Sequence, residues 1–267
     1  MSATAPTNCF VAMFDILGFK ALRKLRGTAG LHQLYARSIA AMIQHAAAGS
    51  GTTTQINNET LYVPRFTPYS PQFRAISDTA IFFTADDSFT SFLFIVHSSF
   101  CLLQSGFVGS KAPYRGAIGW GDLINDDSGI LIGSALEDAY DGEGKQAWAG
   151  CMLTNECCRV AASMNYLRRY RDFHLTEASK RQDERERRTM MEDAERLVEY
   201  PVQLKANDRS DAQDGYSTSN AWVIDWTIRM YEGAAANSFL PSESTRAQAI
   251  AKNTIEFEKW ARARRPS

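Results

Sequence analysis

The chain has 267 residues, of which 45% are hydrophobic and 22% are charged, and its formal net charge is −1. This length is enough to bury one substantial core. A nearly neutral chain has no overall field that would attract it to DNA, RNA or an anionic membrane, so no nucleic-acid or membrane partner is predicted.

The sequence indicates neither an export signal nor a membrane-spanning segment. Residues 1–8 carry no cationic stretch, and the apolar run that follows is broken by Asp15, which is not typical of a signal peptide. The apolar run around residues 92–96 is far shorter than the roughly 20 residues of a membrane span. The five cysteines are an odd number without zinc-type spacing, and Cys157 and Cys158 are adjacent. Reduced, mostly buried thiols and a cytoplasmic location are therefore predicted.

The first half of the chain alternates strand and helix patterns. Residues 9–19 are apolar and predict a buried strand, and residues 31–48 lack Gly and Pro and predict a helix. Residues 49–71 contain three prolines and are expected to form a loop. Residues 73–84 predict a hairpin with Asp78 at or near its turn, and residues 86–106 predict a second helix.

The second half continues with shorter elements. Strands are expected at residues 114–123, 130–132, 151–154, 200–205 and 221–226, and helices at 134–148 and 253–263. Residues 176–199 are highly charged and predict a solvated helix or a protruding insertion. Together these elements predict one α+β domain over residues 1–267, with its core at about 9–160 and 200–226 and with helices on one face of a largely antiparallel sheet.

Two aspartates inside apolar runs are the strongest chemical signal. Burying Asp15 or Asp78 is costly unless something compensates the charge, and a divalent cation is an obvious candidate. Asp15 is followed by Gly18, which lets the backbone turn and expose N–H groups to an anion. The alternatives are a helix cap for Asp15 and a simple turn residue for Asp78.

Four segments in order carry a resemblance to a known family: residues 14–19, 76–79, 115–121 and 133–139. They resemble the metal and helix motifs of the class III nucleotidyl cyclase catalytic domain, which has a ferredoxin-like βαββαβ core. The match covers about residues 9–160. Residues 114–117 and 133–148 are most similar to the pyrimidine cyclases of the Pycsar antiphage defence systems.

The resemblance implies a chemistry and a set of ligands. The ribose 3′-oxygen would attack the α-phosphorus while pyrophosphate leaves, assisted by two Mn²⁺ or Mg²⁺ ions. Asp15 and Asp78 would hold these ions, with the Ile16 carbonyl as an extra ligand. The backbone amides of three residues would contact the β- and γ-phosphates: Leu17, Gly18 and Phe19.

Departures from the purine enzymes bear on the substrate. Arg74 stands where adenylate cyclases have a lysine that reads the purine, and Ile130 stands where they have an aspartate. An aliphatic side chain cannot accept a hydrogen bond from the adenine amino group. Their transition-state asparagine and arginine are replaced by Glu137 and Asp141, so a cation must come from elsewhere.

Arg115 is the first candidate for that cation or for reading the base, because its planar fork suits a phosphate or a carbonyl edge. The alternative is a surface arginine on an edge strand. Tyr114 is a candidate for stacking on the substrate, or it fills the core. Lys205 could reach phosphates or be simply exposed, and Glu143 and Lys145 match family-like positions with a structural role equally open.

The sequence therefore favours a cyclase that makes cyclic UMP, ahead of cyclic CMP, as a second messenger in antiviral defence. A head-to-tail homodimer with composite sites and a separate effector that reads the product are implied by the resemblance. The alternatives are a purine cyclase, a catalytically silent nucleotide-binding sensor, and an interaction module whose working part is the charged segment.

Overall fold

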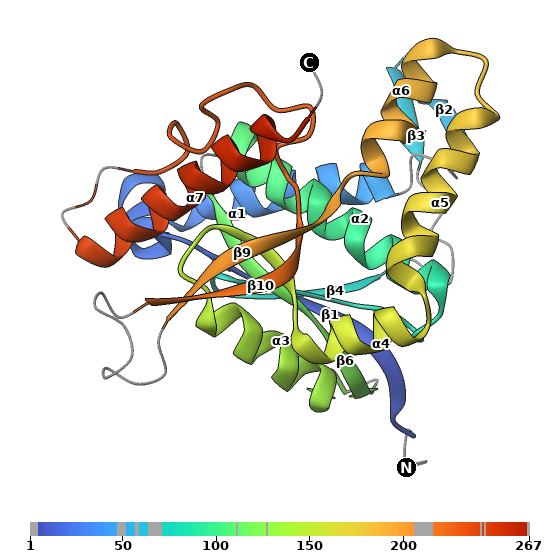
Figure 1. The fold of residues 1–267 in the computed structure, drawn as a ribbon. Helices are drawn as coiled ribbons and strands as arrows, with labels where there is room; N and C mark the ends of the chain where they lie inside the picture. The colour runs from blue at the N-terminus through green and yellow to red at the C-terminus, as the bar shows by residue number, and fades with distance from the viewer. Residues whose placement is uncertain are drawn as a thin grey trace.

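A computed structural model describes residues 5–46, 52–56, 59–63, 71–110, 112–126, 128–205, 216–240, 242 and 244–265. Its centre is one mixed sheet with the strand order β4-β5-β1-β6-β8-β10-β9, and β7 pairs with β6 (Figure 1). The strands are β1 (Thr7–Ile16), β4 (Gln72–Ile76), β5 (Thr79–Phe83), β6 (Tyr114–Asn125), β7 (Leu131–Ile132), β8 (Gly150–Leu153), β9 (Leu197–Lys205) and β10 (Tyr216–Ile224). All these pairs are antiparallel except β6 with β8.

The helices are α1 (Phe19–Ala46), α2 (Phe89–Ser105), α3 (Ser134–Lys145), α4 (Asn155–Ser163), α5 (Tyr166–Ser179), α6 (Glu184–Asp193) and α7 (Thr245–Ala263). A π-helical turn, η1 (Gly106–Ser110), follows α2. The order β1-α1-β4-β5-α2-β6, with β1 and β5 central, is the expected ferredoxin-like βαββαβ arrangement. The α+β fold class is confirmed.

The helices cover both faces of the sheet, so the expectation of helices on one face is wrong (Figure 1). Alternation along β1 explains this. Phe10, Ala12 and Phe14 join the core beneath α2, whereas Cys9 and Val11 pack with Ala135 and Ala139 of α3. Both faces of β1 are apolar, and each therefore needs a helix layer.

Several boundaries differ from those predicted. Helix α1 begins at Phe19 rather than near residue 31, with a kink at Gly27 where φ is +66°. Strands β2 (Thr52–Ile56) and β3 (Glu59–Val63) form a hairpin inside the expected loop. The remainder of that predicted loop, residues 49–51, 57–58 and 64–70, lies outside the described residues.

The predicted charged segment, residues 176–199, contains the end of α5, all of α6 and the first residues of β9, and α5 and α6 form a hairpin that projects from the sheet (Figure 1). Residues Phe89–Val108, which include α2, are long and apolar enough to span a membrane, with a mean hydropathy of 1.5. However, 67% of that window is buried within the protein, as in a core helix. All five cysteines are free, as predicted, and four of them are buried.

Candidate active site

Strand β1 and the β4–β5 turn bring Asp15 and Asp78 together. Asp15 lies opposite Thr79 in the β1–β5 register, and the Ile16 N–H donates to the Asp78 carbonyl at 3.0 Å. The turn that carries Asp78 is closed by Ser77 in the left-handed conformation, with φ of +59°. Asp78 is one of the groups that raise the pKa of the Asp15 carboxyl, as expected of neighbouring acids. The two side chains predicted as metal ligands are therefore neighbours.

The electrostatics of this pair favour a bound cation. Burial, followed by the charges of Glu143 and Asp78, raises the pKa of Asp15 to about 6 against the opposing effect of Arg115. No cluster of three His, Cys, Asp or Glu side chains suited to a metal occurs among the described residues. Two carboxylates completed by substrate phosphates are the usual protein ligands of Mg²⁺, so the donor set fits an ion that arrives with a nucleotide.

The turn after β1 has the backbone conformation that an anion site needs. Gly18 has φ of +75°, and its carbonyl accepts the first α1 hydrogen bond, from the Leu22 N–H at 3.0 Å. The Leu17 N–H donates to the Pro113 carbonyl at 2.9 Å, which corrects the expectation that all three turn amides are available. Only the amides of Gly18 and Phe19 keep that predicted role.

Arg115 is buried beside Asp15, so the alternative of a surface arginine on an edge strand is wrong. It lies on the central strand β6 opposite Asp15, and its Nη2 is 3.6 Å from Asp15 Oδ2. Its Nε and Nη2 both bind Glu143 Oε1, and its Nη1 donates to the Gln146 carbonyl at 3.3 Å. The guanidinium is thus held in one orientation at the acid pair.

Glu143 and Lys205, whose roles the sequence left open, both lie at this site. Glu143 is buried near the end of α3. Lys205 Nζ donates to the Gly144 carbonyl. Burial, followed by the charges of Arg115 and Arg246, lowers the pKa of Lys205 to about 8 against the opposing effect of Glu143 and Asp15. The pairing of β9 with the end of α3 places both groups near Asp15, and that contact between distant segments leaves no local pattern in the sequence.

Of the two residues predicted to read the base, Arg74 lies close to the acid pair along the sheet. It is four residues before Asp78, and it pairs with Ile81, which in turn pairs with Met13, two residues before Asp15. Its Nη2 donates to Asn125 Oδ1 at 3.3 Å. Ile130 is exposed in the turn between β6 and β7.

Tyr114 has its side chain in the core. It is fully buried, and its ring packs edge-on against Phe14 with centroids 6.4 Å apart. The structure therefore favours the alternative that Tyr114 fills the core. Its buried side chain has no surface that a substrate could contact in this conformation.

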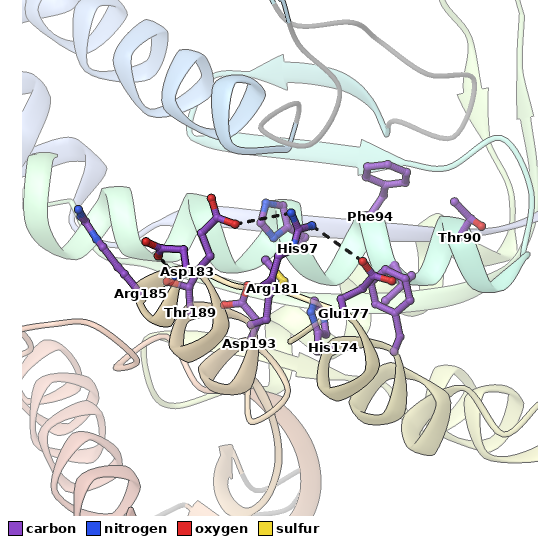
Figure 2. A pocket seen from close by; sticks show the side chains of 14 residues that line it. Thr90, Phe94, His97, His174, Glu177, Arg181, Asp183, Arg185, Thr189 and Asp193 are labelled. Atoms are coloured by element: carbon purple, nitrogen blue, oxygen red, sulfur yellow. Dashed lines mark hydrogen bonds and ion pairs between the residues drawn. The ribbon is translucent and has the colours of Figure 1, made fainter. Parts of the chain in front are cut away.

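A separate cavity of about 990 Å³ lies between α2 and the α5–α6 hairpin (Figure 2). Its apolar lining includes Leu93, Phe94 and Phe173. Charges at its mouth are paired, because Arg181 lies 3.9 Å from Glu177 and 3.6 Å from Glu186. At its floor Asp193 pairs with both Arg196 and Arg229. None of the predicted site residues lines this cavity.

Comparison with known proteins finds similar solved structures only. No family model matches, and no curated protein matches. The catalytic core of a rhodopsin-guanylyl cyclase with converted specificity, in complex with ATPαS, is 11% identical, with a TM-score of 0.44 over 82% of this chain and 96% of that chain. The guanylate cyclase domain of RhGC from Catenaria anguillulae, in complex with GTP, is 11% identical, with a TM-score of 0.42 over 83% and 98%.

The adenylyl cyclase CyaB from P. aeruginosa is 11% identical, with a TM-score of 0.39 over 83% of this chain and 95% of that chain. At these values the likeness describes an α+β arrangement and says nothing of the activity of this chain.

Proposed function

We propose that this chain is a nucleotidyl cyclase that converts a pyrimidine nucleoside triphosphate, preferably UTP, to its 3′,5′-cyclic monophosphate and pyrophosphate. The observation that carries the proposal is the adjacency of the Asp15 and Asp78 carboxyls beside the Gly18 turn. Two acids that repel each other at the end of a strand, next to a turn with a positive φ, can hold divalent cations and phosphate oxygens at once.

The reaction forms one P–O bond and breaks another. The ribose 3′-oxygen attacks the α-phosphorus, the bond to the β-phosphate oxygen breaks, and the hydroxyl proton passes to solvent. Asp15, Asp78 and the Ile16 carbonyl would hold two Mn²⁺ or Mg²⁺ ions, which lower the pKa of the attacking hydroxyl and neutralise the leaving pyrophosphate. Arg115, fixed by Glu143, would stabilise negative charge on the phosphates.

The proposal includes a head-to-tail homodimer with two composite sites, which the resemblance to the class III cyclases implies. Arg74, in register with Met13 near Asp15, would contact the base. Ile130 offers no acceptor for an adenine amino group, which supports a pyrimidine over a purine. A cytoplasmic second-messenger role in antiviral defence, with a separate effector that reads the product, belongs to the same proposal.

One assay tests the activity. Purified protein is incubated with each of the four ribonucleoside triphosphates and Mn²⁺ or Mg²⁺, and cyclic product and pyrophosphate are quantified. We expect product chiefly from UTP, with CTP second. Product chiefly from ATP or GTP would reject the pyrimidine assignment, and no product from any of the four would favour a silent nucleotide sensor.

A further inference from the structure

The cavity between α2 and the α5–α6 hairpin has the size of a small-molecule site. Its volume of about 990 Å³ lies at the upper end of the range of about 300–1,000 Å³ that is usual for ligand pockets. One wall is a single face of α2, where the lining residues are spaced by three or four positions from Thr90 to His97. Helices α5 and α6 form the facing wall (Figure 2). The charged segment of the sequence, which the catalytic site does not use, thus encloses this space.

The walls of the cavity carry apolar side chains that the fold leaves uncovered. Leu93 and Phe94 of α2 are half-buried, and so is Met190 of α6. Phe173 of α5 is 40% exposed. Aromatic and thioether groups pack well on flat rings. A molecule with flat apolar faces would therefore remove exposed apolar area on all three helices at once.

The mouth of the cavity offers no net charge to a ligand. Arg181 lies 3.9 Å from Glu177 and 3.6 Å from Glu186, so its charge is shared between two acids (Figure 2). Two lining residues form no ion pair in the described chain, Asp183 and Arg185, and these are exposed and opposite in sign. A charged ligand would lose its hydration without finding an unpaired counterion, which favours an uncharged one.

The floor of the cavity leaves one polar side chain without partners. Asp193 pairs with Arg196 at 2.6 Å, and Arg196 Nη1 donates to His97 Nδ1, so these groups are satisfied. His174 is 8% exposed, and neither of its ring nitrogens has a hydrogen-bond partner in the part of the chain that the structure describes. Burial is the main cause that lowers the pKa of His174 to about 3, so its ring is neutral.

The orientation of His174 leaves one nitrogen for a ligand. Nδ1 is enclosed by protein atoms, so Nε2 lies on the part of the ring that is still exposed, and this residue lines the cavity (Figure 2). A neutral imidazole carries one donor and one acceptor nitrogen. A hydroxyl both donates and accepts, and it would therefore satisfy Nε2 in either tautomer. Buried polar groups without partners are rare, which makes this ring a natural anchor.

We propose that this cavity binds an uncharged, flat aromatic molecule whose hydroxyl, or a similar polar group, hydrogen-bonds to His174. The apolar walls would cover its two faces, and the paired charges would surround its rim. This site is separate from the one that contains Asp15 and Asp78, and the inference does not depend on the proposed function.

Three naphthalenes of the same ring shape test the chemistry of the ligand in equilibrium dialysis against the full chain. We expect 1-naphthol to bind about fivefold more tightly than naphthalene, the scale of one neutral hydrogen bond. Naphthalene-1-sulfonate should bind at least about 10-fold more weakly than 1-naphthol, because its charge would have no unpaired partner.

Two variants locate the binding. His174→Phe keeps the apolar volume and should abolish the advantage of 1-naphthol over naphthalene, while naphthalene itself still binds. Leu93→Glu places a charge in the apolar wall and should weaken 1-naphthol binding by at least about 10-fold. The control is Leu25→Glu, the same change at a leucine of α1 that is 68% exposed and lies outside the cavity, and it should leave the affinity unchanged.

Each contrary result overturns the proposal. The absence of saturable 1-naphthol binding would reject the site, and tightest binding of the sulfonate would reject an uncharged ligand. A preference for 1-naphthol that survives in His174→Phe would exclude the predicted hydrogen bond. Equal losses in Leu93→Glu and Leu25→Glu would place the binding elsewhere. Because naphthalene binding to His174→Phe also reports an intact cavity, the test does not depend on the stability of Leu93→Glu.

Discussion

Two regions of this protein bury charge, and they do so in opposite ways. Burial raises the pKa of both Asp15 and Asp193. At Asp193 the guanidiniums of Arg196 and Arg229 oppose that rise, whereas at Asp15 the charges of Glu143 and Asp78 add to it and Arg115 opposes it. The cavity beside Asp193 is far larger than the space at the Gly18 turn. The difference teaches that unbalanced charge, rather than cavity volume, marks the candidate catalytic site.

The strongest way to sharpen this contrast is to neutralise the unbalanced acids. Asp15→Asn and Asp78→Asn should each reduce cyclic-nucleotide formation by at least about 10³-fold, because the loss of one carboxylate removes a ligand shared by both ions. Asp172→Asn, an exposed acid on α5 paired with Arg168, is the control and should keep full activity. More than a tenth of wild-type activity in either site variant would remove that residue from the metal centre.

Asp193→Asn tests the balanced region. It leaves Arg196, which is 2% exposed, without its carboxylate partner, so the free energy of unfolding should fall by about 3 kcal/mol. Denaturant titration measures this loss. The specific activity of the folded protein should stay within about twofold of wild type. A loss of activity with unchanged stability would instead indicate that the cavity beside Asp193 is a functional site for catalysis.

Arg115 forms a buried ion pair with Glu143 and is also the proposed phosphate-binding cation, and two variants separate these roles. Arg115→Ala should reduce activity by about 10²-fold and also destabilise the fold, because Glu143 would remain buried without its partner. Adding Glu143→Gln to Arg115→Ala should recover the stability but not the activity. Recovery of both would show that Arg115 serves only to neutralise Glu143.

The raised pKa of Asp15 predicts a pH dependence of the metal-free protein. Its folded value of about 6 lies above the unfolded value near 3.8, so ionisation disfavours the fold. Below about pH 4 Asp15 is protonated in both the folded and the unfolded state and does not lower the stability. As the pH rises through 6, its ionisation progressively destabilises the fold. In EDTA at pH 8, Asp15→Asn should therefore be more stable than wild type by about 2 kcal/mol, a difference that thermal unfolding at pH 4 should not show. An equal difference at both pH values would contradict this origin.

The smallest expected effect is at Arg74 on β4. Arg74→Ala should change the ratio of kcat/KM for UTP and CTP by about fivefold, the scale of one exposed polar contact to the base, and leave stability unchanged. Arg168→Ala, an exposed arginine on α5, is the matched control. An unaltered ratio would exclude Arg74 from reading the base.

The sequence was informative where chemistry and local pattern coincide. Asp15, Asp78 and Gly18 each stand in a strand or turn pattern that predicts their backbone, and the structure places them together. Helix α1 was underestimated because residues 19–30 are rich in basic side chains and contain two glycines, which weaken a helical pattern. The sequence left the roles of Lys205 and Glu143 open, because they reach the site through a contact between distant segments that no local pattern encodes.

Helix α3 has a consequence for the proposed homodimer. It begins at Ser134, just after β7, and near its end it carries Glu143, which binds Arg115. In a head-to-tail dimer the two ends of each α3 would lie at different active sites. Substrate binding at one site would then change the other site through α3, and the rate would depend on substrate concentration with a Hill coefficient different from one.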